Sequence, residues 1–132
     1  MRYMLDTNIC IYLIKRKPAS VIENLKTHMQ DGISISTITL AELEHGVAAS
    51  AHPEKNSLAL KQLLTIINVS AFDDEAAACY GTIRADLQQK GTPIGPLDTL
   101  IAAHAKAKNL TLVTNNIREF ERIKGLTLAN WA

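Results

Sequence analysis

Carboxylates from well-separated parts of the chain are the side chains best placed to do chemistry in this sequence. Asp6 directly follows a short apolar run, and Asp98 shares helical i, i+3, i+4, i+7 spacing with three core-type residues, Ile101, Ala102 and Ala105. A charge that faces a core is costly unless a cation, hydrogen-bond donors or water compensate it. Several such carboxylates meeting at one place would repel one another and raise their pKa values, and a hard divalent cation would relieve that repulsion.

Each of these acidic residues also has a purely structural explanation. Asp6 could cap the following helix by accepting backbone N–H bonds, and Asp98 could be an acidic first-turn residue favoured by the helix dipole. Glu42 lies in a predicted helix over 37–50, but Glu44 fits the same helical spacing equally well. Periodicity therefore does not choose between Glu42 and Glu44.

The other potential metal ligands do not form a zinc pattern. His45 and His52 are seven residues apart, and His28 and His104 are isolated, so all four are predicted to be surface or packing residues. Cys10 and Cys79 form no CxxC pair, and we expect them to be small apolar side chains in a reducing compartment. Oxygen ligands alone favour Mg²⁺ or Mn²⁺.

Alternating strands and helices must position these carboxylates. Strands are predicted at 3–5, 33–36, 69–72, 110–113 and 126–128, and helices at 8–16, 20–30, 37–50, 53–67, 73–91 and 97–108, with a short one near residue 120. Ser20 and Glu23 predict a capping box. The alternation predicts one α/β domain over 1–132, a three-layer α/β/α sandwich with a mainly parallel central sheet. Ligands of such folds bind beyond the carboxyl ends of the strands, where Asp6, Asn116 and Glu119 are expected.

Composition limits the classes of function. The chain has 132 residues, 47% apolar and 20% charged, with a net charge of +1, which fits a folded domain without a general coat of positive charge. Any contact with nucleic acid must then come from a local patch. Asp6 interrupts the N-terminal apolar run, and no apolar run approaches the roughly 20 residues of a membrane span, so we expect a cytoplasmic protein with no membrane contact.

Four motifs in order resemble the PIN-domain ribonucleases. They are Met4-Leu5-Asp6-Thr7-Asn8, Thr39-Leu40-Ala41-Glu42-Leu43, Ile94-Gly95-Pro96-Leu97-Asp98 and Val113-Thr114-Asn115-Asn116. More narrowly, the sequence resembles the VapC toxins of type II toxin–antitoxin pairs, of the enterobacterial type, over nearly its whole length. The resemblance implies an endoribonuclease that uses Mg²⁺, with Mn²⁺ as a substitute, held by Asp6, Glu42 and Asp98. It favours Glu42 over Glu44.

The resemblance has one departure and several further implications. Where the family usually has a fourth Asp, this sequence has Asn116, so either Asn116 contributes a neutral oxygen or Glu119 supplies the catalytic charge. Thr7 and Thr114 are expected to orient carboxylates. The implied substrate is the anticodon loop of initiator tRNA, and the implied partners are a VapB-type antitoxin, a second copy of the chain in a homodimer, and promoter DNA through the antitoxin alone. Candidate RNA contacts are Lys15, Arg16, Arg84 and Arg118.

Two other interpretations compete with an active nuclease. Asp73 and Asp74 follow a predicted strand, as the phosphate-accepting Asp of a receiver domain does, although a receiver also has paired acids after its first strand. The Asn115-Asn116 pair leaves open a catalytically inactive PIN domain that only binds RNA.

Overall fold

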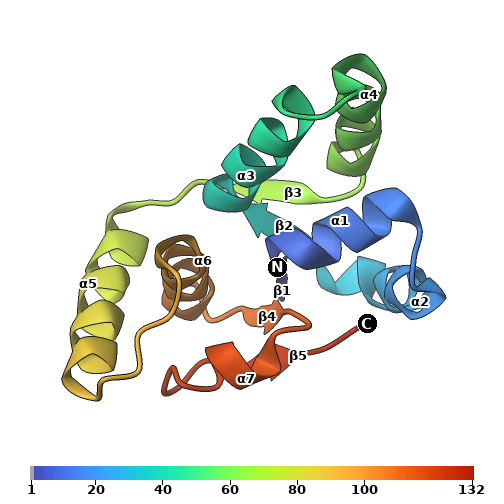
Figure 1. Ribbon diagram of the computed structural model, residues 1–132. Coiled ribbons are helices and arrows are strands. Elements are labelled where there is room, and N and C mark those ends of the chain that lie inside the picture. The colour runs from blue at the N-terminus through green and yellow to red at the C-terminus, as the bar shows by residue number, and fades with distance from the viewer. Residues whose placement is uncertain (1) are drawn as a thin grey trace.

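A five-stranded sheet lies at the centre of the computed structural model, which describes residues 2–132 (Figure 1). The strands are β1 (Tyr3–Leu5), β2 (Ile33–Ser36), β3 (Asn68–Ser70), β4 (Thr111–Val113) and β5 (Leu128–Ala129), and they lie in the order β3-β2-β1-β4-β5. All four neighbouring pairs are parallel. The predicted parallel α/β architecture is therefore confirmed, and three inner strands end at the same edge.

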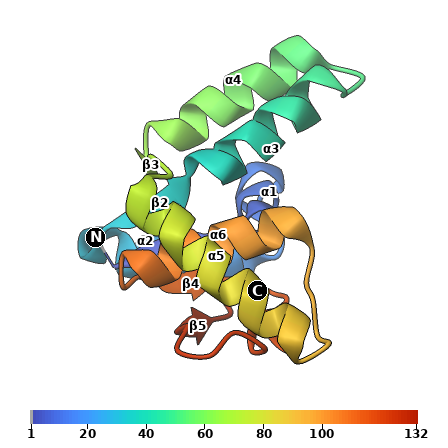
Figure 2. The same ribbon diagram turned by 90° about the vertical axis from the view of Figure 1, so that its left-hand side faces the viewer.

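Helices cover both faces of this sheet, as Figures 1 and 2 show. One side carries α1 (Thr7–Lys15), α2 (Ala19–His28), the short 3-10 helix η1 (Met29–Asp31), α3 (Thr37–Ala48) and α4 (Pro53–Leu64), and the other carries α5 (Asp74–Gln89) and α6 (Pro96–Ala107). Helix α7 (Ile117–Phe120) follows β4. Side chains alternate along β1, so Leu5 packs in the first core cluster and Met4 in the second. Burial on both faces explains why β1 is a short apolar run.

The predicted capping box was wrong. Helix α2 begins at Ala19 after Pro18 at its N-cap, so Ser20 lies inside the first turn and no side chain caps the helix. In strand β2, isoleucine and serine alternate, yet all four residues are buried. The buried Ser34 hydroxyl has a hydrogen-bond partner, since it donates to the Tyr3 carbonyl oxygen at 3.0 Å.

His104 joins α6 to the sheet through hydrogen bonds. Its side chain is fully buried, with Nδ1 2.8 Å from Ser36 Oγ and Nε2 3.2 Å from Ser70 Oγ. Phe72 packs edge-on against the imidazole with ring centroids 5.5 Å apart. Burial lowers the pKa of His104, so the ring is neutral at pH 7. Helix α6, which carries Asp98, is thereby joined to β2 and β3.

Both cysteines are free thiols: Cys10 is buried, as expected, and Cys79 is half-buried. Within residues 2–132, no helix has the length and apolar character needed to cross a bilayer.

We expect His104→Ala to lower the free energy of unfolding by about 2–4 kcal/mol, because it opens a cavity and removes the partner of the buried Ser36 hydroxyl and of the partly buried Ser70 hydroxyl. His52→Ala is the matched control, since His52 is exposed and its side chain caps no helix. Urea denaturation of both variants measures the difference. Equal stability of the two variants would contradict the role given to His104.

Candidate active site

Three carboxylates follow the ends of three neighbouring strands, and a fourth lies at the start of a helix beside them. Asp6 comes directly after β1, Glu42 lies in α3 after β2, and Glu119 lies in α7 after β4, while Asp98 is in the first turn of α6. Because the carboxyl ends of parallel strands share one edge of the sheet, these segments bring the acids to one side of the molecule.

Asp6 is the buried member of the group. Its side chain is 5% exposed, and Oδ1 accepts a hydrogen bond from the Ile9 amide at 3.0 Å as the N-cap of α1. Burial raises the pKa of the Asp6 carboxyl, against the opposing effect of a hydrogen bond from the Thr114 side chain. The capping explanation is therefore correct, and the cap holds a carboxylate in place at the end of the central strand.

Glu42, and not Glu44, faces the other acids. The Thr7 hydroxyl donates to Glu42 Oε1 at 2.7 Å, which joins α3 to the first residue of α1. Glu44 is exposed, because two residues turn about 200° around a helix. The contact gives Thr7 the orienting position that the sequence resemblance implied for it.

Asp98 and Glu119 interact with each other. Burial and then the charges of Glu119, Glu42 and Asp6 raise the pKa of Asp98 to about 6. Glu119 is itself held at both oxygens, since Oε2 accepts from the Asn116 side-chain amide at 2.8 Å and Oε1 from the Gly95 backbone amide at 3.3 Å. Asn116 thus orients Glu119 as a hydrogen-bond donor, at the position where the family usually has an acid.

Among residues 2–132, no basic side chain forms an ion pair with this group. Within the part of the chain that the structure describes, none of the four carboxylates forms an ion pair, and the ion pairs join Lys90 to Asp86 and Lys108 to Asp73 and Glu75. Within residues 2–132, no three His, Cys, Asp or Glu side chains are already arranged to hold a metal ion. The site is a set of coupled, uncompensated oxygen donors, and this donor chemistry fits a hard divalent cation.

The candidate basic side chains are unevenly distributed around the carboxylates. A hollow of about 550 Å³ beside Glu42 is lined by Thr7, Asn8, Ile11, Ile38, Ala41, His45 and Leu97. Of the four candidate RNA contacts, Arg118 is exposed next to Glu119 on α7. Lys15 and Arg16 lie at the other end of α1, roughly 15 Å of helix from Asp6, and Arg16 lines a different hollow between α1, α2 and α4. The structure does not bring these two to the acids.

Sequence reasoning missed two tyrosines near this edge. The Tyr12 hydroxyl accepts from the Asn115 side-chain amide at 2.8 Å, and the Tyr80 hydroxyl accepts from Arg84 Nη1 at 2.9 Å. The second contact has a sequence signal, because Tyr80 and Arg84 are four residues apart on one helix. The first joins residues 103 positions apart and has none.

Comparison with known proteins agrees with this geometry. The sequence matches the PIN domain family over residues 3–126. The chain belongs to the PIN domain family. It is 46% identical over 132 residues to the tRNA(fMet)-specific endonuclease VapC of Shigella flexneri, covering 100% of this chain and 99% of that protein. Nucleases of this family are generally divalent-metal dependent.

Solved structures of PIN-domain proteins superpose closely. VapBC2 from Rickettsia felis bound to a DNA fragment from its promoter gives a TM-score of 0.96 at 47% identity, with 100% of both chains covered. DNA-bound VapBC from Salmonella typhimurium gives 0.95 at 43% identity, covering 100% of this chain and 99% of that one. The receiver interpretation is wrong, because the family match spans the fold and Asp73 caps α5 by accepting from the Ala76 amide.

Removing the charge of Asp98 is expected to stabilise the metal-free protein. The pKa of Asp98 is about 6 in the folded state against 3.8 as its ordinary value, so the folded state binds more protons between pH 4 and 6 and stability falls as pH rises through that window. Because Asp98 is half-exposed, we expect Asp98→Asn to gain about 1 kcal/mol at pH 7.5 in chelator, about 3–5 °C in Tm, and almost nothing at pH 4.

The matched control is Asp86→Asn, which removes a carboxylate that is paired with Lys90 at 2.9 Å. It should give no gain at pH 7.5. Thermal unfolding followed by circular dichroism measures both. A gain for Asp98→Asn that is the same at pH 4 would contradict the repulsion described here.

Proposed function

We propose that this protein is the toxin of a type II toxin–antitoxin pair, an endoribonuclease that cuts the anticodon loop of initiator tRNA and so inhibits translation. The observation that carries the proposal is the group of Asp6, Glu42, Asp98 and Glu119 at one sheet edge, which has no ion-pair partner among the described residues. The printed name of the Shigella relative supports the substrate. In this proposal residues 1–132 act as one PIN domain in the cytoplasm, where tRNA is found.

The carboxylates are the proposed ligands of a divalent metal cofactor. Asp6 and Asp98 would hold a Mg²⁺ ion, or Mn²⁺ in its place, and Glu42 would hold it directly or through water. When bound, the ion supplies a lowered pKa for water and positive charge for the phosphoryl oxygens. Glu119 completes the negative charge of the site, oriented by Asn116.

The chain keeps these ligands in position before any substrate arrives. The helix cap fixes Asp6, the Thr7 hydroxyl fixes Glu42, and the Gly95 amide and Asn116 fix Glu119. No three of the acids of residues 2–132 yet stand in a metal-binding arrangement, but side chains restrained in this way lose less freedom when they close on an ion or a phosphate, which favours electrostatic catalysis.

The negative charge of the carboxylates also accounts for inhibition by the expected antitoxin. A VapB-type antitoxin would inhibit the site by placing a basic side chain among the carboxylates, which lowers their pKa values as a cation does. VapBC2 from Rickettsia felis was solved on promoter DNA, and we propose that this chain reaches DNA only through its antitoxin and forms a homodimer.

Charge-removing substitutions should separate the catalytic acids from other acids. We expect Asp6→Asn and Asp98→Asn to lower cleavage of initiator tRNA at least 100-fold and Glu42→Gln at least 10-fold, since each removes charge that holds the ion. Glu44→Gln, on the same helix as Glu42 but exposed, should stay within twofold of the parent. Gel assays with Mg²⁺, with Mn²⁺ and with chelator give the rates.

A parent protein that binds tRNA but leaves it uncut in Mg²⁺ and in Mn²⁺ would overturn the proposal in favour of an inactive RNA-binding domain. Equal rates for Glu42→Gln and Glu44→Gln would remove Glu42 from the site.

The chemistry of the cut ends reports the nucleophile. If water attacks the phosphate, and not the ribose 2′-hydroxyl, the products carry 5′-phosphate and 3′-hydroxyl ends. Labelling by polynucleotide kinase should then require prior phosphatase treatment. Cyclic phosphate ends would show that the 2′-hydroxyl attacks and that the proposed role of the acids is wrong.

A further inference from the structure

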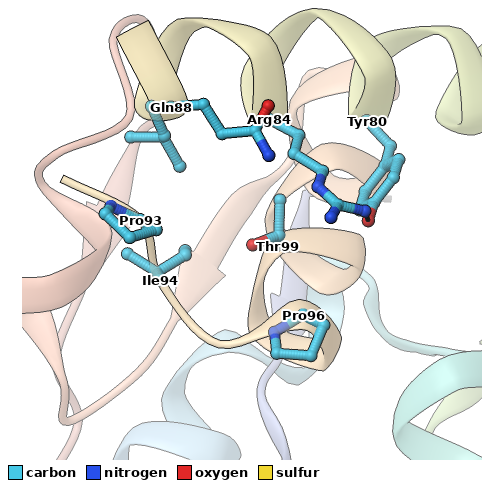
Figure 3. Close-up of a pocket in the computed structure, with 8 residues that line it drawn as sticks. Tyr80, Arg84, Gln88, Pro93, Ile94, Pro96 and Thr99 are labelled. Carbon is cyan, nitrogen blue, oxygen red and sulfur yellow. Dashed lines mark hydrogen bonds between the residues drawn. The ribbon is translucent and has the colours of Figure 1, made fainter. Parts of the chain in front are cut away.

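A second hollow lies on the other side of the loop that precedes Asp98. It has a volume of about 210 Å³ and is formed by Tyr80, Arg84 and Gln88 of α5 facing Pro93, Ile94 and Pro96 of the loop. Figure 3 shows Arg84 and Tyr80 side by side on α5, with Thr99 between them and the loop. Pockets for drug-sized ligands have about 300–1,000 Å³, so this one suits a single small group.

This hollow is separated from the carboxylates by one residue of backbone. Gly95 lies between Ile94 and Pro96, which both line the hollow, and its amide donates to Glu119 Oε1. A Cβ on Gly95 would lie 3.6 Å from Asp98 Oδ2. The Arg122 side chain also donates to the Pro93 carbonyl oxygen at 3.2 Å, so the turn that follows α7 contacts the same loop. A strand of RNA with one phosphate at the acids would therefore place its neighbouring nucleotide near this loop.

Arg84 is the cation of the hollow, and it is already oriented. Its Nη1 donates to the Tyr80 hydroxyl at 2.9 Å, and its guanidinium carbon is 6.0 Å from the centre of the Tyr80 ring. Among residues 2–132 it forms no ion pair. Lys90, on the same helix, is paired with Asp86 at 2.9 Å. An exposed guanidinium with no carboxylate partner is suited to charge-assisted bonds with a phosphate.

We propose that this hollow is a substrate subsite in which Arg84, oriented by Tyr80, binds the phosphate next to the one that is cleaved. The inference rests on the proposed RNA-cleaving function and adds to it the residue that sets the position of the strand. The apolar walls, Leu87, Ile94 and the two proline rings, contact the sugar or base of that nucleotide. Negative acids and a positive subsite on opposite sides of one loop give the bound strand a fixed register.

Salt dependence tests the proposed phosphate contact. On an anticodon stem-loop of initiator tRNA, Arg84→Ala should raise KM about 10-fold with kcat within twofold. The slope of log(kcat/KM) against the logarithm of the salt concentration should decrease in magnitude by about 0.7, the value for one phosphate contact on a single strand. Arg84→Lys should recover part of the loss, and Tyr80→Phe should lie between the parent and Arg84→Ala. Lys90→Ala, the matched control on α5, should leave both quantities unchanged.

A chemical change in the RNA locates the contact. Stem-loops that carry one methylphosphonate, which lacks the negative charge, are made at each position that flanks the cut. One flanking position should cost the parent about 10-fold in kcat/KM and cost Arg84→Ala nothing further. Losses that multiply at every position, or an Arg84→Ala variant that behaves like Lys90→Ala, would overturn the subsite.

Binding measurements with the same stem-loops test the subsite separately from the proposed catalysis. In the Asp98→Asn background, Arg84→Ala should weaken the Kd for the stem-loop about 10-fold, and the sensitive methylphosphonate should again have no added effect. If the parent binds the stem-loop but does not cut it, the proposed catalysis fails, and this binding result alone decides the subsite. Unchanged binding would refute it.

Discussion

Uncompensated negative charge at one edge of the sheet is the interaction on which the rest of this structure depends. Four carboxylates gather there, and the described chain gives none of them an ion-pair partner; burial, together with the charges of the other three acids, raises the pKa of Asp98 to about 6. The fold keeps them in place with the Asp6 cap, the Thr7–Glu42 bond and the Asn116–Glu119 bond. A positive charge from outside must complete such a site. A metal ion would do this in the active protein, and a basic side chain of the antitoxin in the inhibited one, which makes the two occupants mutually exclusive.

The sequence predicted the sheet and two of the acids because their signals are local. A buried strand that runs into Asp6, and a charge at helical spacing with three small or apolar residues at Asp98, are visible in a few consecutive positions. Glu42 could not be separated from Glu44 in this way, since the distinction depends on Thr7, which lies 35 positions away. The capping box at Ser20 failed because the helix begins earlier, and the buried serines of β2 depend on Tyr3 and His104 from distant parts of the chain.

Cations were the least predictable part of the site. Lys15, Arg16, Arg84 and Arg118 look alike in the sequence, but the fold leaves Lys15 and Arg16 a helix length from Asp6 and puts Arg84 beside the loop that precedes Asp98. The replacement of an acid by Asn116 has a comparable explanation. The amide donates to Glu119, so negative charge is kept at this edge by a residue one helical turn further along.

Metal uptake by the free protein tests the central claim most directly. Calorimetric titration of Mn²⁺ or Mg²⁺ into the parent at pH 7.5 should show saturable binding, and the same titration into Asp98→Asn should show that binding lost or weakened by an order of magnitude. Glu44→Gln should bind as the parent does. A parent that takes up neither ion, or an Asp98→Asn variant that binds as tightly as the parent, would contradict the account of these carboxylates as a cation site.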